Sequence, residues 1–301
     1  MASTDKFIKF GIPKGSLEQL TLDLLRKSGW RITVDARSYI PKVDDSALSL
    51  RMLRPQEMPI YVADGSLDAA ITGHDFVVEN NVALHQVESF IYAKATLTPS
   101  RWVLCVRDDS PVKRLEDLEG KRIATEIVEF VKRVLSERKV NAEVEFSWGA
   151  TEAKVAEGII EAAVDVTETG SSLRANGLRI VEELLVSNPV LVANPASWKD
   201  PWKQAKIRQL GVLIRGALDA ENRVGIKMNV AKENLEKVIA LLPSITAPTI
   251  SHLYASPALK GKEWLAVETV ITETTVRELF PKLLEAGAVG IVEFPLNKII
   301  G

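Results

Sequence analysis

The sequence predicts an α/β protein of two similar lobes, each a mostly parallel sheet covered by helices, followed by a small α+β domain. Three observations support this fold class. Apolar strands alternate with helical segments from the N-terminus to about residue 220, as in βαβ units. Two stretches within that region resemble each other. A new order of strands and helices then begins near Asn222.

The first lobe begins with a strand, a glycine-containing turn and a helix. "FIKFGIPKG" is an apolar run that ends in a loop, and leucines then recur at helical spacing until Gly29. "ALSLRML" predicts a second strand, Pro55 leads into a short helix, and "LDAAITG" predicts a third, buried strand. This order is typical of a parallel sheet.

A second series begins at "RWVLCVR", which predicts a strand. An aspartate-rich turn, a helical turn at Leu115 and Leu118 and the strand "GKRIAT" follow it. Beyond Arg179, "PVLVANP" predicts one more apolar strand, and "PWKQAKIRQLGVLIRGALDAE" predicts a long helix.

Residues 64–73 and 157–170 carry the internal similarity. Both contain an acid, a glycine, an apolar residue, a second acid and two alanines, which predicts a helix end, a glycine cap and a buried strand. Chance is an alternative, because junctions of this kind favour the same residues. If the lobes are related, residues 72–75 and 167–172 face one cleft, since ligands of α/β sheets bind beyond the carboxyl ends of strands.

The C-terminal segment predicts a βαβαβ unit with short turns. Its strands are "RVGIKMNV", "EWLAVETVI" and "AVGIVEFPL", and its helices are "KENLEKVIALLP" and "TVRELFPKLLEAG". About 80 residues is within the usual size of a domain. Because it has no phosphate loop, we expect it to serve regulation or assembly.

Composition narrows the class of protein. A chain of 301 residues exceeds what one core usually holds, and a net charge of −2 gives no general attraction to nucleic acid or anionic membranes. No stretch approaches a signal peptide or a membrane span, so we predict a cytoplasmic protein. Cys105 cannot form an internal disulfide and is expected to be buried and inert. The three histidines, His74, His85 and His252, do not have zinc-ligand spacing.

"DVTETGSSLRANGL", residues 165–178, is the candidate phosphate loop. A buried strand ends at Val166, and Ser171 or Ser172 can cap the helix that follows. Free N–H groups at the start of that helix, a permissive Gly170 and nearby hydroxyls suit a phosphate. Asp165 and Glu168 would repel it and suit sugar hydroxyls or magnesium instead. A well-capped turn without ligand is the alternative.

With four further regions, this loop resembles the ATP phosphoribosyltransferase family, the first enzyme of histidine biosynthesis. These regions are "GIPKGSL" at 11–17, residues 53–75, "GKRIAT" at 120–125, and a C-terminal region made up of 243–251 together with 285–300. The resemblance covers nearly the whole chain and includes the third domain, so it points to the long, histidine-regulated form. Members commonly carry an arginine where this chain has Ser16, so a serine hydroxyl stands here in place of one basic phosphate contact.

The resemblance implies a more specific fold. It implies two periplasmic-binding-protein-like α/β lobes that form a catalytic cleft, plus a ferredoxin-like, ACT-type regulatory domain. The expected lobe I comprises 1–95 and 187–218 on the nucleotide side. Lobe II is then 96–186, with the phosphoribosyl pyrophosphate loop, and the histidine-binding domain is 219–301.

The resemblance also assigns residues to the site. Asp165, Glu152 and Lys14 are the expected catalytic residues, although a solvated helix acid and a surface lysine are alternatives for the last two. Arg54 begins a helix, where a cation interacts unfavourably with the helix dipole, and this suggests that it has another function. For Asp75 the alternative is a structural role as the N-cap of the next helix. Phosphoribosyl pyrophosphate is expected on Asp165, Thr167, Glu168, Thr169, Gly170, Ser171, Ser172 and Leu173, and the nucleotide on Lys14, Gly15, Leu17, Arg54 and Asp75.

The implied reaction joins N1 of ATP to C1 of phosphoribosyl pyrophosphate and releases pyrophosphate. Mg²⁺ is the expected cofactor, bound by the substrate and not by a dedicated protein site. Histidine is the expected inhibitor, and the protein is expected to form a homo-oligomer in equilibrium between dimer and hexamer. Neither nucleic acid nor a membrane is an expected partner. Two alternatives remain: a two-lobed binding module without catalysis, or a weakened relative that senses histidine only. Turnover of both substrates would distinguish the enzyme from either.

Overall fold

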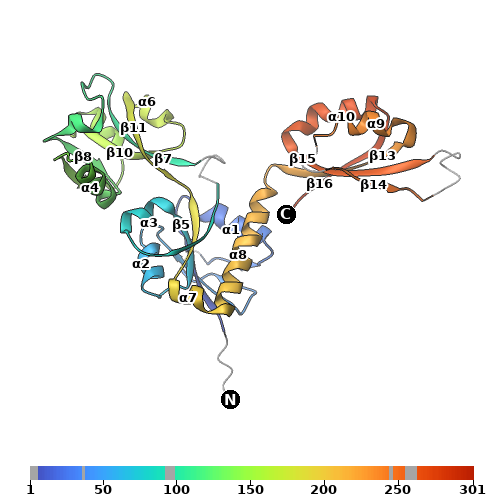
Figure 1. The fold of residues 1–301 in the computed structure, drawn as a ribbon, viewed down its shortest axis with the longest axis horizontal. Coiled ribbons are helices and arrows are strands. Elements are labelled where there is room, and N and C mark those ends of the chain that lie inside the picture. The colour runs from blue at the N-terminus through green and yellow to red at the C-terminus, as the bar shows by residue number, and fades with distance from the viewer. Residues whose placement is uncertain (1–5, 36–37, 92–98, 244–246, 255–262) are drawn as a thin grey trace, which may run out of the picture. The chain divides into compact units, whose positions relative to one another are not determined.

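The computed structural model describes residues 6–35, 38–91, 99–243, 247–254 and 263–301. The chain divides into two compact units, Met1–Gly211 and Val212–Gly301. The first unit holds two five-stranded sheets and the second a four-stranded sheet; Figure 1 labels several of their strands. The expected α/β fold with a separate C-terminal domain is therefore confirmed. No helix in the described ranges is long and apolar enough to cross a membrane.

Lobe I is built on a five-stranded sheet that has two parallel strand pairings followed by two antiparallel pairings. Its strands, in spatial order, are β4 (Leu48–Leu53), β1 (Ile8–Pro13), β5 (Ala69–Gly73), β12 (Pro189–Ala193) and β6 (His85–Ser89). The first three strands are parallel to one another, whereas β12 is antiparallel to both β5 and β6. A short antiparallel pair, β2 (Ile32–Thr33) and β3 (Lys42–Val43), lies outside this sheet.

Lobe II repeats the same arrangement. Its strands, in spatial order, are β9 (Glu143–Phe146), β8 (Arg122–Thr125), β10 (Ala162–Thr167), β7 (Ser100–Arg107) and β11 (Leu178–Ser187). Again the first three are parallel, and β7 is antiparallel to both β10 and β11. The two internally similar stretches lead into β5 and β10, which are the central strands of the two sheets. Gly65 and Gly158, which precede these strands, both have positive φ angles, of 82° and 71°.

The expectation of mostly parallel sheets is wrong, because two of the four pairings in each sheet are antiparallel. The reason is topological. The chain enters lobe II through β7 and returns to lobe I through β12, and each of these strands runs against the parallel block of its sheet. Strands β6, β9 and β11 were not predicted. They carry charged side chains and are only partly buried, so their apolar pattern is weak.

Helices follow each strand of the parallel blocks and also the antiparallel strands β12 and β7. In lobe I they are α1 (Glu18–Lys27), α2 (Met58–Ala63), α3 (His74–Asn80) and α7 (Pro195–Lys199), and in lobe II they are η1 (Leu115–Leu118), α4 (Val128–Glu137), α5 (Thr151–Ala156) and α6 (Ser171–Ala175). The predicted long helix is α8 (Pro201–Asp219), which runs from the first unit into the second.

Each lobe buries its own apolar core. In lobe II, η1 and α4 pack on β7, β8 and β10 through residues such as Leu115, Val131 and Val164, all fully buried. In lobe I, α2 packs on β5 and β12 through Met58 and Val62. Apolar burial of this kind is the main stabilising contribution to such layers.

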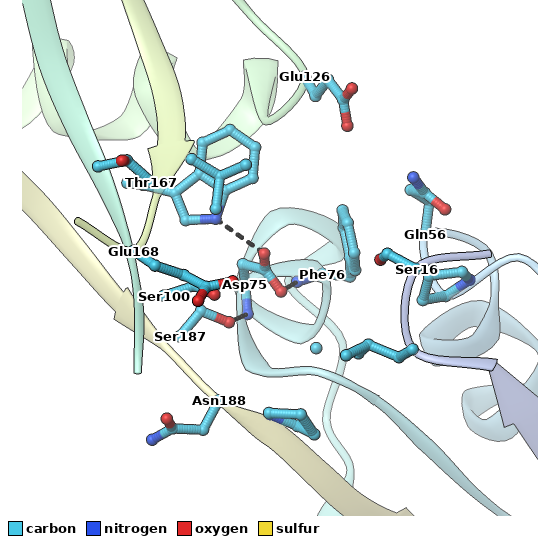
Figure 2. Close-up of a pocket in the computed structure, with 16 residues that line it drawn as sticks. Ser16, Gln56, Asp75, Phe76, Ser100, Glu126, Thr167, Glu168, Ser187 and Asn188 are labelled. Carbon is cyan, nitrogen blue, oxygen red and sulfur yellow. Dashed lines mark hydrogen bonds between the residues drawn. The ribbon is translucent and has the colours of Figure 1, made fainter. Parts of the chain in front are cut away.

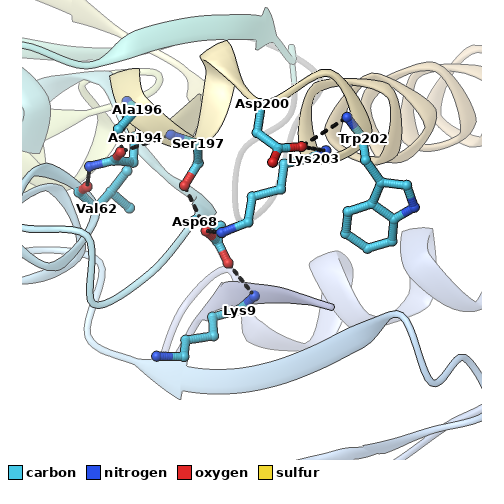
Figure 3. Close-up of polar contacts among 9 residues, drawn as sticks. All are labelled: Lys9, Val62, Asp68, Asn194, Ala196, Ser197, Asp200, Trp202 and Lys203. Atoms are coloured by element: carbon cyan, nitrogen blue, oxygen red, sulfur yellow. Dashed lines mark hydrogen bonds and ion pairs between the residues drawn. The ribbon is translucent and has the colours of Figure 1, made fainter. Parts of the chain in front are cut away.

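A polar cluster fixes α7 and α8 to lobe I, as Figure 3 shows. The carboxylate of Asp68 accepts hydrogen bonds from the Lys9 amide at 2.8 Å and from the Ser197 hydroxyl and the Lys203 ammonium, both at 2.6 Å. Asp68 is 6% exposed, and these three donors hold its pKa below the ordinary value despite the opposing effect of burial. Buried carboxylates require such compensation, so this cluster has a structural role.

The C-terminal unit is an antiparallel sheet with helices on its core face. Its strands, in spatial order, are β14 (Thr249–His252), β15 (Trp264–Thr272), β13 (Arg223–Ala231) and β16 (Ala288–Pro295). Its helical elements are η2 (Lys232–Asn234), α9 (Leu235–Ile239), η4 (Glu273–Thr275) and α10 (Val276–Glu285). Strand β14 was not predicted. With it, the strand order is that of the ferredoxin-like fold, as expected.

Candidate functional site

A cleft of about 430 Å³ opens at the carboxyl ends of the strands of both lobes. Figure 2 shows Ser16 and Gln56 reaching it from lobe I and Glu126 and Thr167 from lobe II, with Asp75 between them. Further lining residues include Leu17, Gly73, Phe76, Ser100, Trp102, Glu168, Ser187 and Asn188. Residues from the two internally similar loops therefore meet in one hollow, as their positions at the strand ends predicted.

Asp75 lies beneath this cleft and is only 7% exposed. Its Oδ2 accepts a 2.8 Å hydrogen bond from Nε1 of Trp102, and its Oδ1 accepts one from the Phe76 amide at 3.0 Å. The Ser187 hydroxyl accepts from the Asp75 amide at 3.0 Å. Burial raises the pKa of the Asp75 carboxyl, and these hydrogen bonds oppose the rise.

The N-cap alternative for Asp75 is wrong, because α3 begins at His74 and its N-cap is Gly73. Gly73 has an ordinary backbone conformation, but a Cβ built on it would lie 2.0 Å from Oδ1 of Asp75. The glycine therefore makes room for the buried carboxylate. This is the physical reason for the Gly-His-Asp sequence at the end of β5.

Three carboxylates gather near the strand ends of lobe II. Asp165 is on β10, Glu126 directly follows β8, and Glu152 lies in the first turn of α5. Burial, the charge of Glu152 and then that of Glu126 raise the pKa of Asp165 to about 6. Burial and the charge of Asp75 raise the pKa of Glu126 as well. The cluster is thus poised to accept a positive charge or a proton.

The candidate phosphate loop is held by its own hydroxyls. The Gly170 amide donates to Oγ1 of Thr167 at 2.8 Å, and the Ser171 amide donates to Oγ1 of Thr169 at 3.3 Å. These two loop amides are therefore not free, contrary to expectation. The predicted serine cap is also wrong: Gly170 is the N-cap of the short helix α6, with a φ of 73° and no side-chain cap.

Neighbouring side chains brace the same loop. The Ser172 hydroxyl donates to Oε1 of Glu152 at 2.9 Å, which joins the loop to the acidic group on α5. Nη2 of Arg174 donates to the Thr169 carbonyl at 3.1 Å, and Nη2 of Arg101 approaches the Glu168 carbonyl at 3.5 Å. Two guanidinium groups thus stand beside a loop that is proposed to meet an anion.

A second hollow of about 610 Å³ lies on lobe I and is lined by Lys14, Gly15 and Arg54. Ser16, Pro55 and Gln56 line both this hollow and the cleft, so the two adjoin. The Lys14 ammonium lies 4.1 Å from the ring centre of Tyr39, which is 60% exposed. A cation–π contact therefore orients the lysine.

The predicted site residues fall into four groups. Leu17, Asp75, Thr167 and Glu168 line the cleft, and Lys14, Gly15 and Arg54 line the adjoining hollow. Leu173 is 1% exposed and belongs to an apolar cluster of lobe II, so its side chain is part of the core. The remaining members, Asp165, Glu152, Thr169, Gly170, Ser171 and Ser172, form the acidic group and loop beside the cleft.

Sequence reasoning missed several residues of the site. Glu126 directly follows the strand "RIAT". It could have been predicted, because ligands of α/β sheets bind beyond the carboxyl ends of strands, the same argument that was applied to β1, β5 and β10. Trp102 and Tyr39 gave no such signal, because each acquires its role from a partner distant in the sequence.

The described residues offer no ready-made metal cage. Among them, no group of three or more His, Cys, Asp or Glu side chains is arranged to hold a metal ion. Cys105 is buried as predicted, and burial followed by the charges of Asp165 and Glu152 raises the pKa of its thiol to about 12. The thiol is thus an unreactive part of the core.

Comparisons with known proteins agree along the chain. A family model described as ATP phosphoribosyltransferase matches residues 54–216, and one described as the C-terminal domain of HisG matches residues 220–298. The chain is 52% identical over 293 residues to an ATP phosphoribosyltransferase of Desulfatibacillum aliphaticivorans, which covers 97% of this chain and 98% of that relative. It is 50% identical, over 97% of this chain and 99% of the relative, to one of Geotalea uraniireducens (strain Rf4).

A solved structure is similar to the larger part of the chain. It is the ATP phosphoribosyl transferase (HisG:HisZ) complex from Thermotoga maritima, with a TM-score of 0.60 and 27% sequence identity. The alignment covers 69% of this chain and 98% of that chain.

Proposed function

The chain belongs to the ATP phosphoribosyltransferase family, in the long form with a C-terminal domain, and from this premise we propose which residues bind its substrates and how they act. It is a pentosyltransferase of histidine biosynthesis whose substrates are ATP and phosphoribosyl pyrophosphate. With that pathway we assign it to the cytoplasm.

The 5-phosphate of phosphoribosyl pyrophosphate binds the loop from Thr167 to Ser172. Three features support this assignment: the hydroxyls of the loop, the left-handed Gly170, and the flanking guanidinium groups of Arg101 and Arg174. The phosphate takes over the amides of Gly170 and Ser171 from the threonine hydroxyls that accept from them in the free protein. Leu173 contributes to this site through its backbone only.

Asp165 binds the ribose hydroxyls, and Glu152 and Glu168 lie on the same side. The raised pKa of Asp165 supports this role, because burial and the charges of Glu152 and Glu126 disfavour the ionised carboxylate, which a positive charge would stabilise. The acidic group suits Mg²⁺ that arrives with the substrate, since hard oxygen ligands are what this ion prefers. When bound, the ion neutralises charge on the leaving pyrophosphate.

ATP occupies the hollow on lobe I, with Lys14, Gly15, Leu17 and Arg54 around it. Two cations, one oriented by Tyr39, suit its phosphates, and the adjoining cleft brings the base toward lobe II. Asp75 acts from beneath the cleft, where its carboxylate is already occupied by Trp102. Ser16 replaces the usual arginine at the rim shared by both hollows.

The chemical step is a displacement at C1 of the ribose. The N1 lone pair of adenine forms the new N–C bond, the C1–O bond to pyrophosphate breaks, and its electron pair leaves with pyrophosphate, so the anomeric centre inverts. Positive charge develops on the ribose and on the adenine ring. The carboxylates of Asp165 and Glu126 stabilise it, and the loop and the lobe I hollow align the two substrates.

The C-terminal domain binds histidine and controls a dimer–hexamer equilibrium. Support for this is the long form of the family and the ferredoxin-like sheet. The boundaries at 95/96, 186/187 and 218/219 remain our predicted limits for the lobes and this domain.

One observation carries the assignment: the acidic group, the braced loop and the cation-bearing hollow lie around a single cleft. The test is to mix the protein with ATP, phosphoribosyl pyrophosphate and magnesium and follow the near-ultraviolet absorbance of the adduct. We expect turnover that histidine suppresses. Binding of either substrate without turnover would instead favour a two-lobed binding module.

A further inference from the structure

Helix α3 follows a strand of lobe I but makes many of its contacts with lobe II. Asp75, in its first turn, accepts the hydrogen bond from Trp102 on β7. The side chain of Phe76 packs against the apolar core of lobe II. The helix therefore belongs to the junction between the lobes as much as to the lobe from which it emerges.

The last turn of α3 supplies a cap for a helix of lobe II. Oε1 and Oε2 of Glu79 accept hydrogen bonds from the Glu129 and Phe130 amides at 3.0 and 2.8 Å. These amides lie in the first turn of α4, whose own N-cap residue, Ile127, provides no side-chain cap. A carboxylate at this position satisfies two exposed donors and interacts favourably with the helix dipole.

Helix α4 returns the interaction. The guanidinium of Arg133, one turn further along, donates to the carbonyl of Val78 and to that of Glu79, the latter at 3.4 Å. These carbonyls belong to the last turn of α3. Each helix therefore caps the other, across a separation of about 50 residues in the sequence.

The same helix also reaches the cleft lining of lobe I. Nδ2 of Asn80 donates to the Gln56 carbonyl at 3.0 Å, and the Gln56 side chain lines the cleft beside Glu126, as Figure 2 shows. Glu126 immediately precedes the N-cap of α4. The C-terminal end of α3 therefore contacts the residue Gln56 of lobe I and the helix that follows Glu126 in lobe II.

We propose that α3 is a strut that sets the spacing between the two lobes, and that Glu79 and Arg133 are positioning residues for phosphoribosyl transfer. The consequence for catalysis rests on the proposed function; the mechanical part does not. A strut of this kind prepares the cleft before the substrates arrive, which lowers the entropic cost of aligning them.

The strut is tested by measuring the distance between the lobes. Spin labels at Lys42→Cys in lobe I and Lys113→Cys in lobe II report it, since both positions are exposed and Cys105 is buried. We expect a narrow distance distribution in the parent and a broader one in Glu79→Ala. Glu79→Gln, which keeps an acceptor oxygen, is expected to restore part of the narrow distribution. Glu137→Ala, which removes an exposed acid at the C-terminal end of α4, is expected to leave the distribution unchanged.

Steady-state kinetics test the consequence for catalysis. Glu79→Ala is expected to raise KM for both substrates roughly fivefold, the effect of losing one cap from the competent arrangement, with a smaller change in kcat. Arg133→Lys carries the same two tests should Glu79→Ala not fold. An unchanged distance distribution in the folded variants would overturn the strut. If the parent protein had no activity, but the distance between the lobes still depended on Glu79, the proposed function would be refuted and the strut retained.

Discussion

Nε1 of Trp102 donates a 2.8 Å hydrogen bond to Oδ2 of Asp75, and this bond links a strand of lobe II to a helix of lobe I beneath the cleft. Both side chains are almost fully buried. Such a donor is important because a buried carboxylate that loses a partner bears the cost of its desolvation.

Trp102→Phe should therefore destabilise the protein in a pH-dependent manner. Burial raises the pKa of Asp75, so the carboxyl favours the folded state below its unfolded pKa, and this contribution is lost as pH rises through the folded value. Without the indole donor the folded pKa rises further, and the penalty becomes larger at alkaline pH, by about 1–3 kcal/mol. Urea denaturation at pH 5 and pH 8 measures it. An equal loss at both values would mean only a packing defect.

Asp165→Asn is expected to stabilise the protein while it removes activity. With a folded pKa of about 6 against 3.8, the Asp165 carboxyl favours folding below pH 3.8, and that contribution is lost as pH rises through 6. At pH 8 the variant should therefore gain on the order of 2 kcal/mol in unfolding free energy. The gain should vanish near pH 4. Its turnover should fall about 100-fold or more.

Parallel loss of stability and turnover in Asp165→Asn would make this acid structural. A gain in stability when a functional residue is replaced is expected where that residue lowers the stability of the folded protein but is required for activity.

The acid limb of kcat/KM should report Asp165. Protonation of Asp165 should lower kcat/KM below about pH 6, because this parameter follows ionisations of the free enzyme. The charge of Glu152 contributes to the raised value, so Glu152→Gln should shift the limb to lower pH. Glu157→Gln, an exposed acid directly after the same helix, is the matched control. A limb that stays in place in Glu152→Gln would contradict the assignment of the titration to Asp165.

Gly170→Ala should raise KM for phosphoribosyl pyrophosphate without raising that for ATP. Its φ of 73° disfavours a side chain by about 1 kcal/mol, and the added Cβ would lie 2.9 Å from Nη1 of Arg174. Gly177→Ala is the control, because Gly177 has a φ of 68° but no atom within 4 Å of its Cβ position. Similar KM values for phosphoribosyl pyrophosphate in both variants would mean that the loop at Gly170 does not bind the phosphate.

Local patterns predicted much of the fold. Alternation of apolar strands and helices located β1, β5, β8 and β10, and the repeated Asp-Gly and Glu-Gly junctions marked the central strand of each lobe. The strand β11 was missed because its register is interrupted twice and most of its residues are only partly buried. Pairing direction was also wrong, since it is decided by how the chain crosses between lobes and not by the composition of a strand.

The candidate site shows the same division. Residues at strand ends, such as Thr167 and Glu168, were predicted to face a cleft, and they do. The partner of Asp75 was not predicted, because Trp102 meets it only when two lobes pack. Tyr39 was likewise missed, because its contact with Lys14 depends on tertiary structure.

The most direct test of the account is a crystal structure of the protein with phosphoribosyl pyrophosphate and magnesium. We expect the 5-phosphate against Thr169, Gly170, Ser171 and Ser172, and the ribose hydroxyls against Asp165. Electron density for the sugar phosphate elsewhere, with the Thr167 and Thr169 hydroxyls still accepting from the loop amides, would contradict it.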